Sequence, residues 1–288
     1  MNETRQGETQ PSFWTLVVFG IGVLWLFRNF DKIVKAIFYL LRRLWPLAMV
    51  GAWLGYLYLL FQRREPPKHA TFSEPVGSAR AARLELNTSV GETTIRALGA
   101  DSESLIEADL VYFGSIAFEA SGEEEKIVRL SPVFDTWQSL NVFNWLGTKR
   151  ARLRWDIGLS PRVDATLDVK GGVGRFELDL RGLRLRGLNF SAGIGETTLQ
   201  LPTPEQSYTA TVKGGIGAMR IEVPQGAAVR LEATIGLGDV NVAPRLMRVE
   251  GEGVPMGKQG VWETADFASA GQQIVIRYEG GIGELQVR

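Results

Sequence analysis

The repeat pattern of this chain is clearest in the stretch Gly171-Gly172-Val173-Gly174-Arg175-Phe176-Glu177-Leu178-Asp179-Leu180. Here a glycine, an aliphatic residue and a second glycine precede apolar residues at alternate positions. The second glycine of this motif recurs at Gly91, Gly114, Gly174, Gly195, Gly217, Gly238 and Gly283. The residues around Gly114 match the motif most weakly. Between Gly174 and Gly238 successive copies are 21, 22 and 21 residues apart. A fixed period of this length predicts a repeat architecture in which these seven glycines are structural positions.

Each repeat is predicted to contain two strands and two turns. After Gly174, the apolar residues Phe176, Leu178 and Leu180 alternate with charged ones, as in a strand with one buried face. A turn such as 224–226 follows, and a second alternating strand then returns to the next glycine turn. Glycine suits that turn because it allows a positive φ angle and close approach of neighbouring backbones.

Two strand arrangements fit this pattern. If each repeat is one coil of a solenoid, equivalent strands stack in parallel and the glycines form a ladder. If each turn closes a hairpin, the sheet is an antiparallel meander. The coil is favoured because the glycine pattern marks only every second turn. We therefore predict an all-β, β-solenoid-like repeat domain with coils of about 21 residues.

The first part of the chain is predicted to form a membrane α-hairpin. Residues 11–27 and 44–62 are uncharged and strongly apolar, and as helices they would be about 26 and 28 Å long, close to the thickness of a bilayer core. A pair of buried soluble helices is disfavoured because neither run has a polar face. The basic connector 28–43 is interpreted either as an amphipathic helix on the membrane surface or as an extension of the second span.

These features divide the chain into three parts. Residues 1–62 are predicted to form a membrane domain with the lipid bilayer as its partner, residues 63–78 a proline-containing linker, and residues 79–288 the β-repeat domain. Two stretches, 131–149 and 243–268, interrupt the repeats. The first contains Phe134, Trp137, Phe143 and Trp145. It is interpreted as a cover over one end of the stack or as an exposed loop for a partner or a membrane surface.

The composition argues against several functions. The formal net charge is zero, so there is no electrostatic basis for binding nucleic acid, and the chain has no cysteine. The only histidine, His69, falls in the predicted linker, so a histidine-based triad or metal site is not expected in the repeats. We expect no catalytic residues, no cofactor and no metal, and hence no enzymatic activity.

One acidic series is a candidate metal site. Acidic residues follow four of the glycine turns and would form a row in a stacked solenoid: Glu92, Glu196, Asp239 and Glu284. Calcium-binding β-rolls use a nine-residue repeat, whereas here the period is longer and Arg175 and Ala218 interrupt the series. Solvated turn residues are therefore the preferred interpretation.

The arrangement resembles that of the LiaF-like bacterial proteins of the cell-wall-antibiotic response. The resemblance rests on the hairpin segment Leu44-Trp45-Pro46-Leu47 and on the Gly-Ile-Gly-Glu repeats that continue to Gly281-Ile282-Gly283-Glu284. It implies a toastrack β domain and a non-enzymatic membrane regulator that contacts a sensor kinase or another envelope-stress protein. Well-known members have four membrane spans, and this chain shows two.

Two functions follow as expectations. The first is a membrane-anchored regulatory or scaffold protein of the bacterial plasma membrane, acting by protein contacts and open to self-association. The resemblance favours a cytoplasmic β domain, although basic residues flank the second span on both sides. The alternative is a tethered domain that binds or hydrolyses cell-wall polysaccharide through Trp137, Trp145 and Trp262, with acids such as Asp135 or Glu263 nearby.

Overall fold

The computed structural model describes residues 14, 31–32, 35, 39–40, 42–47, 49–56, 66–133, 153–250 and 258–288. The chain divides into two compact units, Met1–Arg63 and Arg64–Arg288. In the first unit every described residue is helical, and large apolar side chains such as Trp45, Leu47 and Trp53 are more than half exposed. Among the described residues, none of the helices reaches the length and apolarity needed to cross a membrane. Apart from Trp14, the predicted span 11–27 lies outside the described residues.

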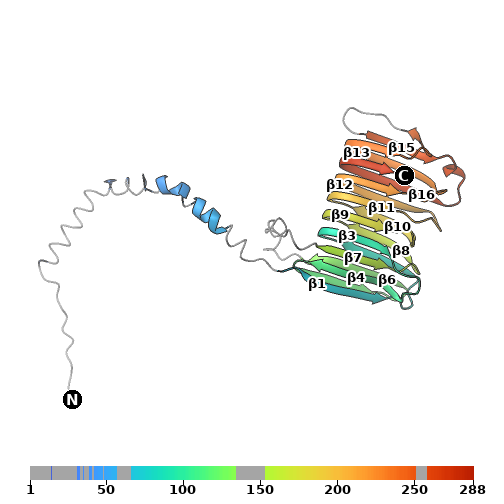
Figure 1. Ribbon diagram of the computed structural model, residues 1–288, viewed down its shortest axis with the longest axis horizontal. Helices are drawn as coiled ribbons and strands as arrows, with labels where there is room; N and C mark the ends of the chain where they lie inside the picture. The colour runs from blue at the N-terminus through green and yellow to red at the C-terminus, as the bar shows by residue number, and fades with distance from the viewer. Residues whose placement is uncertain are drawn as a thin grey trace, which may run out of the picture. The chain divides into compact units, whose positions relative to one another are not determined.

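The second unit is a single sheet of sixteen strands (Figure 1). The strands are β1 (Lys68–Pro75), β2 (Ala81–Asn87), β3 (Val90–Ala97), β4 (Ser104–Tyr112), β5 (Ser115–Ser121), β6 (Glu125–Val133), β7 (Arg154–Leu159), β8 (Asp164–Lys170), β9 (Val173–Asp179), β10 (Arg184–Ser191), β11 (Ile194–Gln200), β12 (Tyr208–Glu222), β13 (Ala228–Val242), β14 (Leu246–Glu250), β15 (Lys258–Thr264) and β16 (Gln273–Val287). A short 3-10 helix, Phe267–Ser269, precedes β16.

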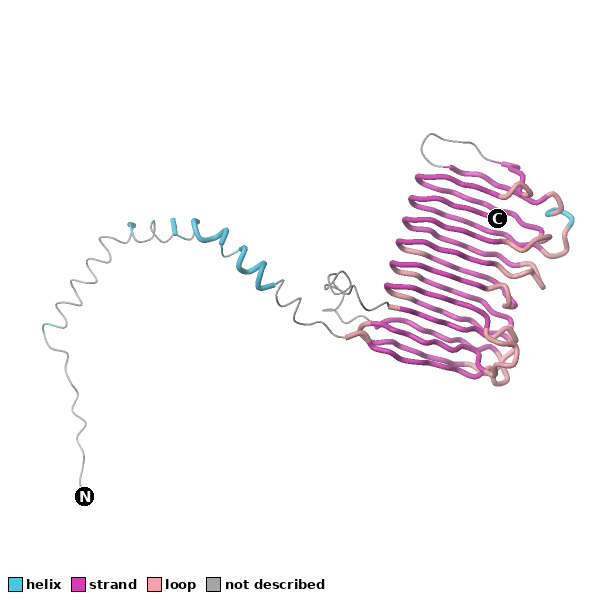
Figure 2. Tube along the Cα trace, viewed as in Figure 1, coloured by secondary structure: helices cyan, strands magenta, loops and turns pink. Residues whose placement is uncertain are grey.

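The sheet folds back on itself to form two layers (Figure 2). β8 leads through 171–172 into β9, and β10 leads through 192–193 into β11, whereas β12, β13 and β16 pass through the same bend without a break. We call the strand segments before the bend the pre-glycine layer and those after it the post-glycine layer. The bend itself is the glycine edge, and the turns at 180–183, 201–207 and 223–227 form the opposite loop edge.

The central coils stack in parallel, which confirms the solenoid arrangement predicted from the glycine spacing. The glycines face one another directly, in the order Gly91, Gly174, Gly195, Gly217, Gly283 and Gly238. Each has a positive φ between 130° and 153°. This order departs from the sequence at one point, because β16 lies between β12 and β13. The last coil, β16, is thus inserted between the coils of β12 and β13 and is not added after β13 at the end of the stack.

Both ends of the stack are antiparallel, so the meander arrangement is also present. β4 pairs antiparallel with β1 and β7, and β5 pairs antiparallel with β6. At the other end β15 pairs antiparallel with β13 and β14. Short antiparallel strands at the ends limit the exposed edge that a parallel stack would otherwise offer to another chain.

Two predictions from the sequence are wrong. Residues 63–78 are not simply a linker, because 68–75 form β1, and His69 therefore lies in a strand, with Nε2 2.6 Å from Asp109 Oδ1. Gly114 is not part of the glycine ladder. It lies in the turn from β4 to β5 with φ 85°, and its carbonyl accepts a hydrogen bond from Lys68 Nζ at 2.9 Å.

The core fills the space between the two layers. Alternate residues of every central strand point inward, and most are fully buried, including Trp155, Leu178 and Leu199. Phe176 of β9 meets Phe190 of β10 edge to face, with ring centroids 6.0 Å apart, so the two layers are in direct contact. At the N-terminal end Phe72 of β1 and Phe118 of β5 close the core, with centroids 5.2 Å apart.

A buried tyrosine links this core to alkaline stability. Tyr208 is buried and donates a hydrogen bond from its hydroxyl to Pro202 O at 2.9 Å, and burial raises the pKa of its phenol. Burial also raises the pKa of Tyr278. In the unfolded chain the tyrosine phenol ionises near pH 10, below its pKa in the folded protein. Above about pH 10 the unfolded state therefore releases the phenol proton while the folded state keeps it, and the free energy of unfolding falls.

We therefore expect the free energy of unfolding, measured with denaturant from pH 7 to 11, to fall above about pH 10. Tyr208→Phe should cost about 1 kcal/mol at pH 7 through the lost hydrogen bond, yet weaken the alkaline decline. An unchanged decline in the double variant Tyr208→Phe, Tyr278→Phe would contradict this explanation.

Candidate interaction surface

A row of aliphatic side chains follows the glycine edge, half-buried at Val90 and Val173 and exposed at its other members. It consists of the residue before each ladder glycine, in register from strand to strand: Val90, Val173, Ile194, Ile216, Ile282 and Leu237. Ile194, Ile216 and Ile282 are 50–51% exposed and Leu237 is 56% exposed. We call this row the aliphatic ridge. Covering the exposed half of one such side chain is worth about 1 kcal/mol, so the ridge offers several kcal/mol to whatever covers it.

The ridge is a consequence of the bend. Inward positions on either side of it are occupied by buried residues such as Val212 and Met219, so the residue between them projects from the edge. The glycines at the bend carry no side chain that could screen it. Sequence reasoning recognised these glycines as structural but assigned no role to the aliphatic residue. One sequence feature could have indicated the ridge: an aliphatic residue recurs with the glycine period at each bend. A polar residue would be tolerated at that position in a soluble repeat protein.

Several other parts of the chain meet the same edge. β1 begins there, as the strand pairings show. His69 lies opposite Val111, and Val111 lies opposite Arg154. Arg154 in turn lies opposite Glu92, the residue that follows the ladder glycine Gly91. β6 ends there at Val133, which is 49% exposed, and β7 begins there. Residues 134–152, which connect β6 to β7 in the sequence, lie outside the described residues.

The outer side of the post-glycine layer carries two polar hollows. The larger, of about 310 Å³, spans β3, β9 and β11 and is lined by Thr94, Arg96, Glu177, Leu178, Asp179, Thr198 and Gln200. The second, of about 220 Å³, continues it over β11, β12 and β16 and includes Glu196, Ala218, Arg220, Glu284 and Gln286. Because Thr198 lines both, they form one shallow polar surface beside the ridge.

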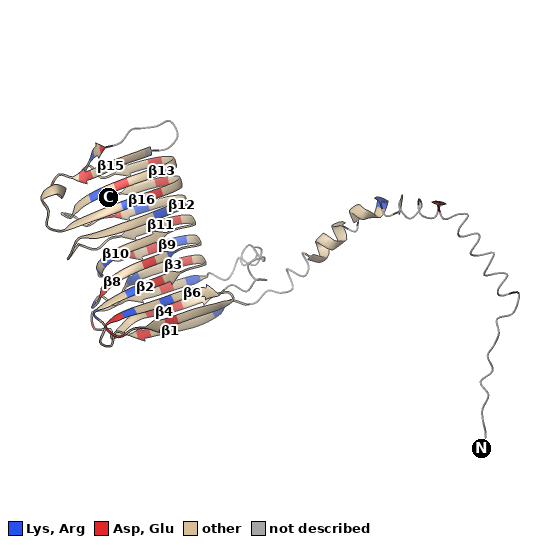
Figure 3. Ribbon diagram, turned by 180° about the vertical axis from the view of Figure 1, so that it is seen from behind, with Lys and Arg blue, Asp and Glu red and all other residues tan. Residues whose placement is uncertain are grey.

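The acidic series does align on this surface. In register, the row reads Glu92, Arg175, Glu196, Ala218, Glu284 and Asp239. Arg175 Nη2 lies 3.1 Å from Glu196 Oε2, and Asn241 Nδ2 donates to Glu284 Oε1 at 2.8 Å. In the described part of the chain, no three histidine, aspartate or glutamate side chains are grouped to hold a metal ion. Basic and acidic residues are both distributed along the strands of the sheet (Figure 3).

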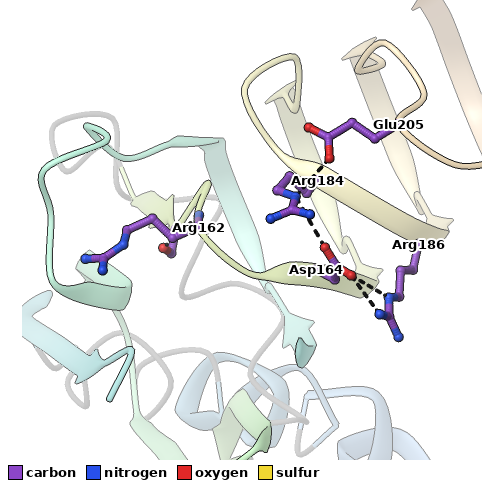
Figure 4. Close-up of polar contacts among 6 residues, drawn as sticks. Arg162, Asp164, Arg184, Arg186 and Glu205 are labelled. Atoms are coloured by element: carbon purple, nitrogen blue, oxygen red, sulfur yellow. Dashed lines mark hydrogen bonds and ion pairs between the residues drawn. The ribbon is translucent and has the colours of Figure 1, made fainter. Parts of the chain in front are cut away.

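Charged side chains cluster where β8 and β10 begin, near the loop edge (Figure 4). This end of the strands therefore differs from the apolar ridge. Asp164, whose side chain is only 18% exposed, pairs with Arg184 at 3.3 Å and with Arg186 at 2.7 Å. Arg184 also pairs with Glu205 at 2.9 Å. These pairs join β8 to β10 and to the following turn, and they neutralise one another within the cluster.

Of the aromatics proposed for polysaccharide stacking, only Trp262 is described. It is 9% exposed in β15 at the end of the stack, and the Arg248 guanidinium lies 5.6 Å from its ring centroid. Glu263 pairs with Arg230 at 2.7 Å. Trp137, Trp145 and Asp135 lie outside the described residues. The described part therefore does not present Trp262 as an open stacking platform.

The sequence profile for the N-terminal domain of toast_rack, DUF2154, matches residues 64–222, which is more than half of the chain. The chain belongs to the toast-rack family. The match begins at the boundary of the second unit, ahead of β1, and so agrees with a β domain that starts before residue 79. In this chain the toast-rack domain forms part of a nearly closed, solenoid-like sheet with antiparallel ends.

Two solved structures are similar to this toast-rack chain. A candidate cell adhesion protein from Clostridium sporogenes aligns with a TM-score of 0.62 and 21% sequence identity, covering 77% of this chain and 98% of that one. A candidate adhesin from Bacteroides fragilis aligns with a TM-score of 0.18 and 9% identity, covering 77% and 97% of the two chains. At this identity the first similarity concerns the fold, and the second carries no argument. No curated protein matches the chain in sequence.

Proposed function

We propose that this toast-rack protein is a membrane-anchored, non-enzymatic regulatory or scaffold protein that acts in bacterial envelope-stress signalling through protein contacts of its β domain. The observation that supports binding most directly is the exposed polar surface formed by the two hollows. Its side chains are held in register on a rigid stack, so little conformational freedom is lost when a partner binds. The Clostridium sporogenes protein, which shares the fold, is described as a candidate cell adhesion protein.

The described helical residues support the membrane anchor. Large apolar side chains are exposed along 42–47 and 49–56, among them Trp45, Val50 and Trp53, each at least 54% exposed. A helix that is apolar on all sides is stable only when something outside it covers those sides, and lipid does so. The resemblance to LiaF-like proteins supports a sensor kinase or another envelope-stress protein as the partner, with the β domain in the cytoplasm.

A site-specific photo-crosslinker in the full chain tests this proposal. At Thr198, in the centre of the polar surface, it should capture an envelope-stress signalling protein from native membranes. The matched control is Thr211, on the outer side of the pre-glycine layer. The charge reversals Arg96→Glu and Arg220→Glu together should lower the yield at least about tenfold, whereas Lys213→Glu should not.

Three results would count against the proposal. These are equal capture at Thr198 and Thr211, capture of non-signalling proteins alone, and release of soluble fragments from cell-wall polysaccharide by the purified chain. The last would favour the polysaccharide alternative, whose remaining aromatic candidates are Trp137 and Trp145.

A further inference from the structure

We infer that the aliphatic ridge is the edge of the β domain that rests on the lipid bilayer, with its side chains at the boundary between headgroups and acyl chains. This inference rests on the membrane anchor of the proposed function. It goes beyond it by assigning a second, peripheral membrane contact to the β domain and by fixing which of its edges faces the lipid.

The first argument is the shape and chemistry of the ridge. Its four most exposed members, Ile194, Ile216, Ile282 and Leu237, are in register on adjacent strands, so they form one continuous apolar line. The line is one side chain wide. An interfacial lipid contact requires such an apolar strip buried to a shallow depth, with polar groups close on either side.

The second argument is the chain path. The uncharged run 44–62 ends six residues before Lys68, where β1 begins at the glycine edge. Six extended residues reach at most about 20 Å. A chain anchored by that run therefore enters the β domain at the edge that carries the ridge. The short tether gives the ridge a high effective concentration at the membrane, so weak apolar contacts suffice.

The third argument concerns the rows that border the ridge. On the post-glycine side they include Arg175, Glu196 and Glu284, and on the pre-glycine side Lys213 and Glu279, which pair at 3.0 Å. Both signs are present on both sides. Flexible charged side chains can extend into the headgroup zone while the ridge is buried. Because the signs are mixed, the contact should depend on apolar burial and should respond little to salt or to anionic lipid.

The absence of cysteine makes a direct test simple. An environment-sensitive fluorophore is attached to single-cysteine variants of the full chain, reconstituted in phosphatidylcholine vesicles with or without brominated acyl chains. The ridge positions are Ile216→Cys and Leu237→Cys, so that one failed variant does not end the test. The control is Gln225→Cys, an exposed turn residue on the loop edge. Bromine about 5–10 Å below the headgroups should quench the ridge labels at least twofold and leave the control unchanged.

Other outcomes separate this inference from the proposed function. If the chain resists carbonate extraction but neither ridge label is quenched, the ridge contact is wrong and the anchor stands. If two differently labelled copies show energy transfer at the ridge without bromine quenching, a second copy covers it and the lipid contact is wrong. If carbonate extracts the chain, the anchor itself fails and the inference fails with it. Quenching that disappears at high salt would also contradict an apolar contact.

Discussion

Gly195→Ala should prevent the β domain from folding stably. An alanine Cβ at this position would lie 1.7 Å from Gly174 O of the neighbouring coil, and the backbone φ there is +144°. The Gly174 oxygen belongs to the main chain, and the position of a Cβ is fixed by its own backbone, so relief requires the two strands to separate and the parallel ladder to open. We expect a loss of more than about 4 kcal/mol in the free energy of unfolding, or insoluble protein.

Two matched variants separate the contributions to this loss. Gly187→Ala in β10 has no positive φ, and its nearest atom would be 3.9 Å away, so it should change stability by less than about 1 kcal/mol. Gly226→Ala meets nothing within 4 Å but has φ +79°, so it isolates the backbone cost of about 1–2 kcal/mol. Denaturant unfolding of the three variants measures the series. Equal losses for Gly195→Ala and Gly226→Ala would show that close approach of the coils is not what requires glycine.

Trp155→Ala should produce the second large effect. Trp155 in β7 is fully buried, and its removal leaves a cavity where the parallel coils meet the antiparallel N-terminal end. Truncation of a buried tryptophan costs about 3–5 kcal/mol. Denaturant unfolding should show this loss.

Trp155→Phe is the informative comparison. Within the described residues, Trp155 Nε1 is buried without a hydrogen-bond partner. An unsatisfied buried donor costs about 1–3 kcal/mol, and phenylalanine removes it while keeping most of the apolar ring. We therefore expect Trp155→Phe to lose no more than about 1 kcal/mol, because the smaller cavity is offset by the missing donor. A loss as large as that of Trp155→Ala would mean that the indole N–H is satisfied.

The central coils could be predicted because their sequence carries two independent periods. Alternation in segments such as 176–180 gives the buried face, and the glycine spacing gives the parallel register. The position of β16 could not be predicted in the same way. Gly238 and Gly283 carry equivalent repeats, so either could neighbour Gly217 by pattern alone, and the order depends on packing between strands distant in sequence.

The ends of the stack were harder to predict because their strands are short and weakly alternating. β1 has only Ala70 and Phe72 as apolar inward residues and ends at Pro75, so it resembles a linker. Gly114 matches the repeat by eye, but its neighbours pair antiparallel, so its positive φ serves a turn between layers. The interruption at 243–268 contains β14 and β15. These strands could not be predicted because glycine and charged residues obscure their alternation. The ridge was overlooked because aliphatic residues within strands are normally taken as core.

The position of β16 has a consequence for synthesis on the ribosome. In a simple solenoid each coil can dock on the previous one as soon as it emerges. Here the slot between β12 and β13 is filled by Gln273–Val287, which are translated after both. A nascent chain must therefore hold β13 away from β12, or release it again, until these residues leave the exit tunnel, so the final coils assemble only after translation has passed them.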